Sequence, residues 1–284
     1  MGGFNGSELA TLSHSFASLG HSPSAPWLHA AMRAFHGALG SSATPPALAK
    51  MLHAMAHLRA RPSRNWMQAV IADARRQIDG FTARELAVVL WSAVVMGHPP
   101  DAVFMSTWFV AAARRMASLQ PEPALLALTA LAATSEGATR PLPARFARLL
   151  VPHLQGMLPL LSAEQLCDVL RCLVALRVRP AEEWMADFES ALESALPRLL
   201  DAERLGGLAW ALGQMRYQPD RSCAAALMRA GGALLPGARA HDVGLLVWGL
   251  MRVELEAPPA WANELLRKAE AEGLSLPTPS TPAV

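Results

Sequence analysis

The chain has 284 residues, of which 52% are hydrophobic and 17% are charged. This composition excludes a disordered polyelectrolyte, a collagen-like fibre and a small disulfide-stabilised domain. The 25 lysines and arginines nearly balance the 23 acidic residues, so any affinity for nucleic acid must come from the local placement of charge.

The three cysteines, Cys167, Cys172 and Cys223, lie in apolar sequence contexts typical of helices. Their odd number and their surroundings indicate buried thiols in a reducing compartment. The longest apolar stretch, 86–97, is too short to cross a bilayer, and the N-terminal residues show neither a secretory nor an organellar presequence. We therefore expect a soluble protein without membrane contact.

An internal repeat of about 39 residues runs along the chain. Its most regular mark is a proline followed four residues later by a large apolar residue, as in Pro62 and Trp66. We call these prolines the anchor positions, with Ala257 in place of the last proline, and the aromatic residue that follows one of them its aromatic anchor. The anchor positions are 23, 62, 100, 141, 180, 219 and 257. Seven repeats are predicted, with approximate bounds 5–43, 44–81, 82–121, 122–161, 162–200, 201–239 and 240–276.

Two helices are predicted in each repeat. In five repeats a residue that caps helix N-termini stands 18 residues before the anchor, and apolar residues then recur at helical spacing. A second helical pattern begins after the anchor proline, which fits the turn before a helix. We name these the A helix and the B helix. The five predicted caps are Asn5, Thr44, Thr82, Ser162 and Asp201.

Stacked helical hairpins of this kind predict an all-α fold, an α-solenoid in which each unit buries its apolar face against its neighbours. No segment alternates polar and apolar residues between turn signals, so no strand is expected. The solenoid is predicted as a single domain over 1–276, with the proline-containing 277–284 as a disordered tail.

The A helices carry a stripe of residues opposite the sector that must pack on the B helices, and we expect this A-helix stripe to line the inner, concave surface. Nine residues before the anchor, six repeats place a His, Trp or Arg, each of which stacks on a base. The stripe predicts contacts to single-stranded RNA. The predicted RNA-binding residues are His14, Lys50, His53, His57, Arg84, Trp91, Arg171, Trp210, Gln214, Trp248 and Arg252.

Five arginines in the turns between A and B helices are predicted to contact the RNA backbone along one edge. The alternative for them is a solvated rim, and the alternative for the stripe tryptophans is a structural place between helices. The turn arginines are Arg59, Arg61, Arg177, Arg179 and Arg216.

The repeats resemble the octotricopeptide (OPR) family of green-algal helical-repeat proteins. The resemblance rests on units such as "LAVVLWSAVVMGHPP" and "LGGLAWALGQMRYQPD" and on the turns "RPSRNWM" and "RPAEEWM", and it extends over about residues 5–273. It implies RNA binding in a chloroplast or a mitochondrion. The role implied is either that of an mRNA maturation or stability factor or that of an rRNA-binding subunit of a ribonucleoprotein such as an algal mitochondrial ribosome. Partners would then be RNA and other proteins of that complex.

No catalytic, cofactor or metal chemistry is predicted. His53 and His57 have the spacing of a helical metal site, but no third ligand is evident, and no glycine-rich phosphate loop or nucleophile elbow occurs. We expect a protein without enzymatic activity. The alternative to RNA binding is a protein-interaction scaffold without direct RNA contact, whose binding would respond little to salt.

Overall fold

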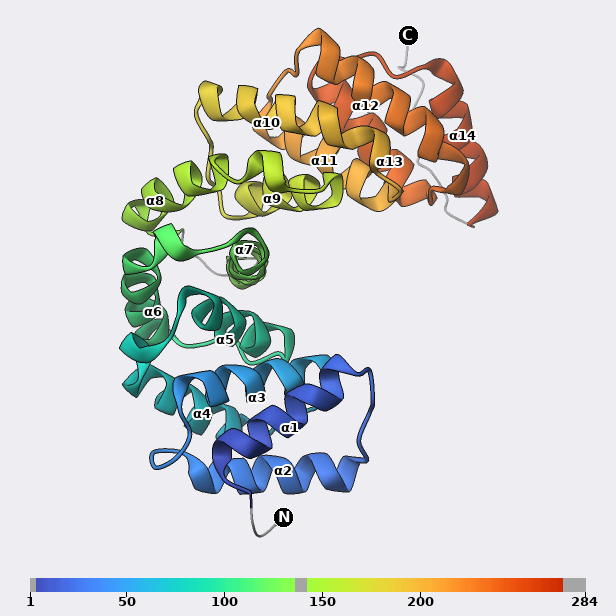
Figure 1. Cartoon of the computed structure of the whole chain (residues 1–284). Coiled ribbons are helices and arrows are strands. Elements are labelled where there is room, and N and C mark those ends of the chain that lie inside the picture. The colour runs from blue at the N-terminus through green and yellow to red at the C-terminus, as the bar shows by residue number, and fades with distance from the viewer. Residues whose placement is uncertain (1–3, 136–141, 273–284) are drawn as a thin grey trace, which may run out of the picture. The chain divides into compact units, whose positions relative to one another are not determined.

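The computed structural model describes residues 4–135 and 142–272, and these residues form only helices and turns (Figure 1). They contain seven A helices and seven B helices in strict alternation. The A helices are α1 Gly6–Ser18, α3 Pro45–His57, α5 Ala83–Val95, α7 Pro121–Ser135, α9 Ala163–Ala175, α11 Ala202–Met215 and α13 Ala240–Arg252. The B helices are α2 Ala25–Ala38, α4 Arg64–Arg76, α6 Ala102–Arg114, α8 Ala144–Gln155, α10 Glu182–Ala195, α12 Arg221–Leu234 and α14 Pro259–Ala271.

The all-α class and the stacked helical hairpins agree with the prediction from the sequence. One feature that the sequence did not indicate is a single 3₁₀ turn between a B helix and the next A helix. The tail 277–284 lies outside the described residues. Among the residues described, no helix is both long and apolar enough to pass through a lipid bilayer. The 3₁₀ turns are η1 Ile78–Gly80, η2 Met116–Ser118, η3 Leu158–Leu160, η4 Leu196–Arg198 and η5 Leu235–Gly237.

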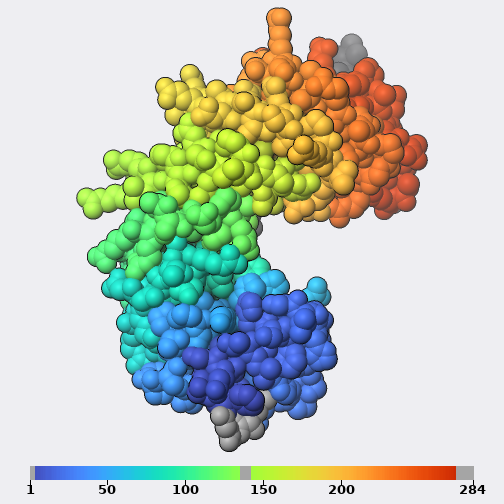
Figure 2. All heavy atoms as spheres, in the orientation of Figure 1, coloured from blue at the N-terminus to red at the C-terminus, as the bar shows by residue number. Residues whose placement is uncertain are grey.

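The described residues belong to two compact units, Met1–Leu154 and Gln155–Val284. In each unit the A helices pack against the next A helix, as α1, α3, α5 and α7 do in the first and α9, α11 and α13 in the second. The B helices form a second layer, and Figure 2 shows side chains filling the spaces between the helices of each unit. Each hairpin thus buries its apolar face against its neighbours, which is the packing of an α-solenoid.

Four of the five predicted caps hold the start of their A helix. The Asn5 side chain accepts the Glu8 N–H at 3.0 Å, and the Glu8 carboxylate accepts the Asn5 N–H at 2.8 Å. Thr82 and Ser162 form the same reciprocal box, and Asp201 accepts two backbone N–H groups. The prediction for Thr44 is wrong, since its side chain makes no capping bond. Two prolines follow it directly, so the first two of the unpaired N–H groups at this helix start are absent, including that of N2, from which a cap accepts.

In five repeats the core contains a leucine four residues after the cap, and aromatic residues of the B helices such as Trp66 and Trp184 are buried with them. These leucines are at most 1% exposed, and burying one contributes about 1.5–3 kcal/mol. Two buried indoles also bond to neighbouring elements. The Trp66 indole N–H donates to the Met32 carbonyl at 2.8 Å, and that of Trp108, a further buried residue of α6, donates to the Leu86 carbonyl at 2.9 Å. The five leucines are Leu9, Leu48, Leu86, Leu166 and Leu205.

Helices α11 and α13 cross closely because glycines face the neighbouring backbone. A Cβ on Gly206 would lie 2.6 Å from the Asp242 carbonyl oxygen, and a Cβ on Gly249 would collide with the Ala209 carbonyl. The absence of a side chain at Gly206 therefore allows the close packing of these two helices. At Gly249, which the sequence did not single out, the clash is with backbone, which no rotamer change can relieve.

The six A helices whose C-terminal ends are described all finish in a left-handed turn. The C-cap residue or the residue after it has a positive φ, as in Arg59 (51°), Arg177 (57°) and Arg216 (51°), and the next N–H bonds back to the helix. For a residue other than glycine this conformation costs about 1–2 kcal/mol. A cation at a helix C-terminus recovers about 0.3–1 kcal/mol, so glycine remains the more stable choice there. The other residues with a positive φ at the ends of A helices are Gly20, Gly97 and Glu254.

Candidate RNA interface

In the first unit, four predicted stripe residues form a ladder of rings across α1, α3 and α5. The His14 ring stacks on the His53 ring with centroids 5.2 Å apart. The His53 ring lies 4.2 Å from that of His57, and the Trp91 ring lies 5.4 Å from that of His57 and 6.0 Å from that of His53. Three consecutive repeats therefore contribute to one continuous aromatic surface, and its members are half-buried or exposed.

We call these four residues the ring ladder; its central member, His53, is uncharged at neutral pH. Burial, and to a smaller extent the neighbouring His57 and His14, lowers the pKa of His53 from 6.5 to about 4. Burial also lowers the pKa of His14, with Lys50 as the next cause. The Nε2 atoms of His53 and His57 are 3.1 Å apart, so one ring donates and the other accepts. At neutral pH the ladder presents ring faces, as a stacking surface requires.

Acidification is expected to destabilise the fold through His53. Because its folded-state pKa lies below that of the unfolded chain, the unfolded state binds the proton first, and stability is lost as the pH falls from about 6.5 towards 4. In urea unfolding at pH 7.5 and pH 5, His53→Phe should lose about 1–2 kcal/mol less than the parent chain. His29→Phe, on an exposed position of α2, is the control. An unchanged pH dependence in His53→Phe would contradict the assignment.

The two cations that the stripe adds to this ladder differ in their surroundings. Lys50 is exposed, and within the described residues it makes no ion pair. Arg84 pairs instead with Glu122 at the start of α7, with N–O distances of 2.8 and 3.5 Å. Because Glu122 of the next repeat compensates the charge of Arg84, this arginine is less available to a phosphate than Lys50 is. Such an exposed pair adds at most about 1 kcal/mol to stability.

In the second unit, the stripe residues of neighbouring A helices lie across glycines of α11. The Arg171 side chain from α9 covers Gly207, where a Cβ would stand 2.6 Å from its Cδ. The Trp248 ring from α13 covers Gly213 in the same way, and the Arg252 guanidinium lies 5.7 Å from the centre of the Trp248 ring. Two glycines thus make room for long planar side chains from both neighbours.

None of the three stripe tryptophans is part of the buried core. Trp91 and Trp210 are half-buried, and Trp248 is 39% exposed. By contrast, the anchors Trp66 and Trp184 are 7% and 2% exposed. A tryptophan that keeps its ring partly in water while an arginine covers it has the surroundings of a stacking site. Gln214, the remaining stripe residue of α11, is exposed.

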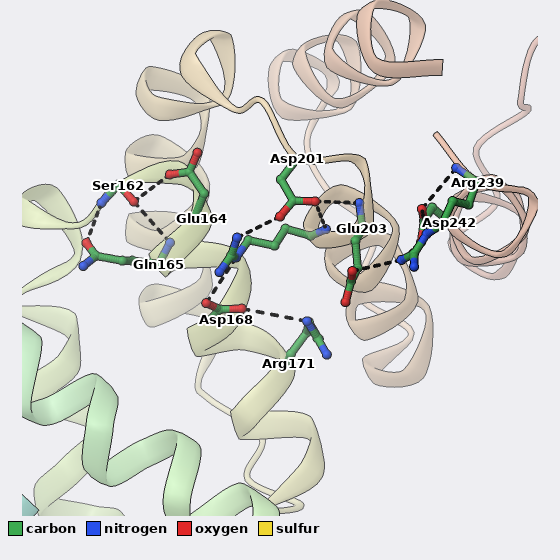
Figure 3. A network of polar contacts seen from close by, with 10 residues as sticks. Ser162, Glu164, Gln165, Asp168, Arg171, Asp201, Glu203, Arg239 and Asp242 are labelled. Carbon is green, nitrogen blue, oxygen red and sulfur yellow. Dashed lines mark hydrogen bonds and ion pairs between the residues drawn. The ribbon is translucent and has the colours of Figure 1, made fainter. Parts of the chain in front are cut away.

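The N-terminal halves of the same A helices are joined by ion pairs between repeats (Figure 3). Arg204 of α11 bonds to Asp168 of α9 at 3.4 Å and to Asp201 at 2.8 Å. Arg239 bonds to Glu203 of α11 at 2.9 Å and to Asp242 of α13 at 3.0 Å. Asp242 also accepts the Arg239 backbone N–H. The sequence did not reveal this network, because its partners are about one repeat apart in the chain.

Hydrogen bonds shift the pKa of two groups at this edge. Those from its own backbone N–H and from the Ser162 hydroxyl lower the pKa of Glu164, near the start of α9. Those that Arg239 donates to Asp242, together with the Asp242 charge, raise the pKa of Arg239. The N-terminal edge of the second unit thus carries acids and arginines that pair with one another.

The predicted turn arginines fall into two groups. Arg59, Arg61, Arg177 and Arg216 are exposed, and the described residues offer them no ion pair. Arg179 donates to the Met215 carbonyl at the C-terminal end of α11. Its guanidinium therefore caps the A helix of the next repeat, a structural role that the sequence did not indicate.

Metal and thiol chemistry find no support among the described residues. No group of three or more His, Cys, Asp or Glu side chains is placed to hold a metal ion there. The three cysteines are buried, and burial raises the pKa of Cys167 and Cys223 to about 12, far from the range of a reactive thiolate.

Comparison with known proteins assigns the chain to a family. A family model described as the Tbc2 translation factor, N-terminal domain, matches residues 77–255, well over half of the chain. The chloroplastic Tbc2 translation factor of Chlamydomonas reinhardtii is 28% identical over 219 residues. The match covers 75% of this chain and 18% of that relative, so the chain spans about a fifth of the relative's length. The chain thus belongs to the family of the Tbc2 translation factor N-terminal domain.

Proposed function

We propose that this protein binds single-stranded RNA in the chloroplast and supports the translation or maturation of a transcript, through repeats of the octotricopeptide type. The observation that carries the proposal is the row of ring and guanidinium groups that successive A helices present outside the core. The family, and the chloroplast translation factor within it, support a role in organellar gene expression. They favour the chloroplast over the mitochondrion and a translation factor over a ribosomal subunit.

The chemistry of the A-helix stripe suits an unpaired strand. Stacking of a base on an aromatic side chain contributes about 1–3 kcal/mol, and it requires bases that are not already stacked in a duplex. Trp248 beneath Arg252 and the Arg171 stem over Gly207 supply such faces in adjacent repeats. The residues around them differ from repeat to repeat, so each unit presents a different surface to its nucleotide.

Salt dependence tests this function against the scaffold alternative. The full chain should bind a fluorescent single-stranded RNA of mixed sequence, and the logarithm of its affinity should fall linearly with the logarithm of salt concentration. A duplex of the same sequence should bind at least several-fold more weakly. Absence of binding to single strands at low salt would overturn the proposal and favour a groove for a protein partner.

A further inference from the structure

Charge is segregated along the A helices of the second unit. The N-terminal halves carry carboxylates of Asp168, Glu203 and Asp242, each already paired with Arg204 or Arg239 (Figure 3). Additional negative charge is unfavourable next to these acids, and their cations are already engaged. Within this network a phosphodiester backbone would meet no unpaired cation.

The opposite ends of the same helices carry arginines that are free to bind. Arg177 follows α9 and Arg216 follows α11, each exposed, at the same place in adjacent repeats. Both occupy the left-handed turn for which glycine is the better residue; in the first unit Gly20 and Gly97 fill that place after α1 and α5, and Arg59 fills it after α3. The stability of the turn does not account for arginine here, since the helix dipole recovers less than the conformation costs.

We propose that the backbone of the bound RNA runs along the C-terminal ends of α9 and α11, with phosphates at Arg177 and Arg216 and bases towards Trp210 and Trp248. This inference rests on the proposed RNA binding, and it adds which end of the A helices the RNA backbone follows. We call the path along these C-terminal ends the phosphate track. Next to this track, α13 ends in Glu254, which holds the same left-handed turn with the opposite charge. The track therefore ends at α11.

Glycine substitution tests the track without damaging the fold. Arg177→Gly with Arg216→Gly removes two cations and relaxes two turns, so helicity should be retained. The slope of log affinity against log salt should become shallower by about 1.4, because each phosphate of a single strand that is no longer neutralised accounts for about 0.7. At 50 mM salt each arginine should account for about an eightfold difference in affinity, and the difference should vanish towards 1 M.

Two substitutions of Glu254 complete the test: one is the matched control, and the other should increase the affinity for RNA. Glu254→Gly relaxes the same turn without removing a cation, so the salt slope should not become shallower. Glu254→Arg should extend the track by one phosphate and steepen the slope by about 0.7. As a control for the other edge, Arg239→Gln should leave the slope unchanged.

The outcomes separate this inference from the proposed function. If the parent chain does not bind single-stranded RNA, the proposed function fails. If the parent chain binds but the arginine variants and Glu254→Arg leave the slope unchanged, the track is wrong while RNA binding stands. If the slope became shallower in Arg239→Gln instead, the RNA backbone would lie at the N-terminal ends of the A helices, and the proposed placement would be wrong.

Discussion

Gly249→Ala is expected to be among the most destabilising single substitutions in the second unit, lowering the free energy of unfolding by about 3 kcal/mol or more. The added methyl group would collide with the Ala209 carbonyl, and α11 and α13 would have to move apart along their length. Urea unfolding followed by circular dichroism measures the change.

The same helix supplies a matched control. Gly244→Ala also adds one methyl group to α13, but the nearest atom, Leu265 Cδ1, lies 3.9 Å away. Alanine is favoured over glycine inside a helix by about 1 kcal/mol, so this variant should gain stability. If the two alanines had equal effects, the close crossing of α11 and α13 would be refuted.

Trp248→Ala is expected to weaken binding of single-stranded RNA about tenfold, and the double variant with Trp210→Ala about a hundredfold. The stacking face is removed in both cases. Because Trp248 is 39% exposed, its removal should lower the unfolding midpoint less than removal of Trp184, which is 2% exposed. Fluorescence anisotropy with a short labelled RNA measures the affinity, and Trp248→Phe should restore most of it, since phenylalanine also stacks.

A control for the removal of apolar surface is Leu266→Ala, because Leu266 is 49% exposed on the B helix α14 of the same unit. This variant should bind RNA like the parent chain. Equal reductions in affinity from Trp248→Ala and Leu266→Ala would mean that general hydrophobic contact, not stacking on the A helices, holds the RNA. A large drop in the unfolding midpoint of Trp248→Ala would instead assign that ring to the core.

The fold could be predicted from the sequence because each repeat restates the same local signals. A cap such as Ser162, a leucine four residues later and an aromatic anchor such as Trp184 recur at fixed spacing, so each hairpin carries the same set of signals. The failure at Thr44 has a local cause that the sequence displays, namely the two prolines that follow it. The left-handed ends were missed because the usual signal is glycine, and Arg59, Arg177 and Arg216 stand in its place.

The candidate site was less predictable because its contacts join separate repeats. Helical spacing placed His14, His53 and Trp91 on one stripe, and the structure brings their rings together. The same reasoning could not show that Arg84 is engaged by Glu122 or that Arg179 caps α11, since both partners come from the following repeat. Arginine side chains are long enough to reach several groups of the neighbouring repeat, and only the folded structure shows which of these groups they contact.

Crosslinking tests the central claim, that the A helices contact RNA, most directly. A single-stranded RNA carrying 4-thiouridine would be bound to the full chain and irradiated, and the modified peptides would be identified by mass spectrometry. We predict crosslinks in α9, α11 and α13, within Ala163–Ala175, Ala202–Met215 and Ala240–Arg252. Crosslinks confined to the B helices α10, α12 and α14 would contradict the account.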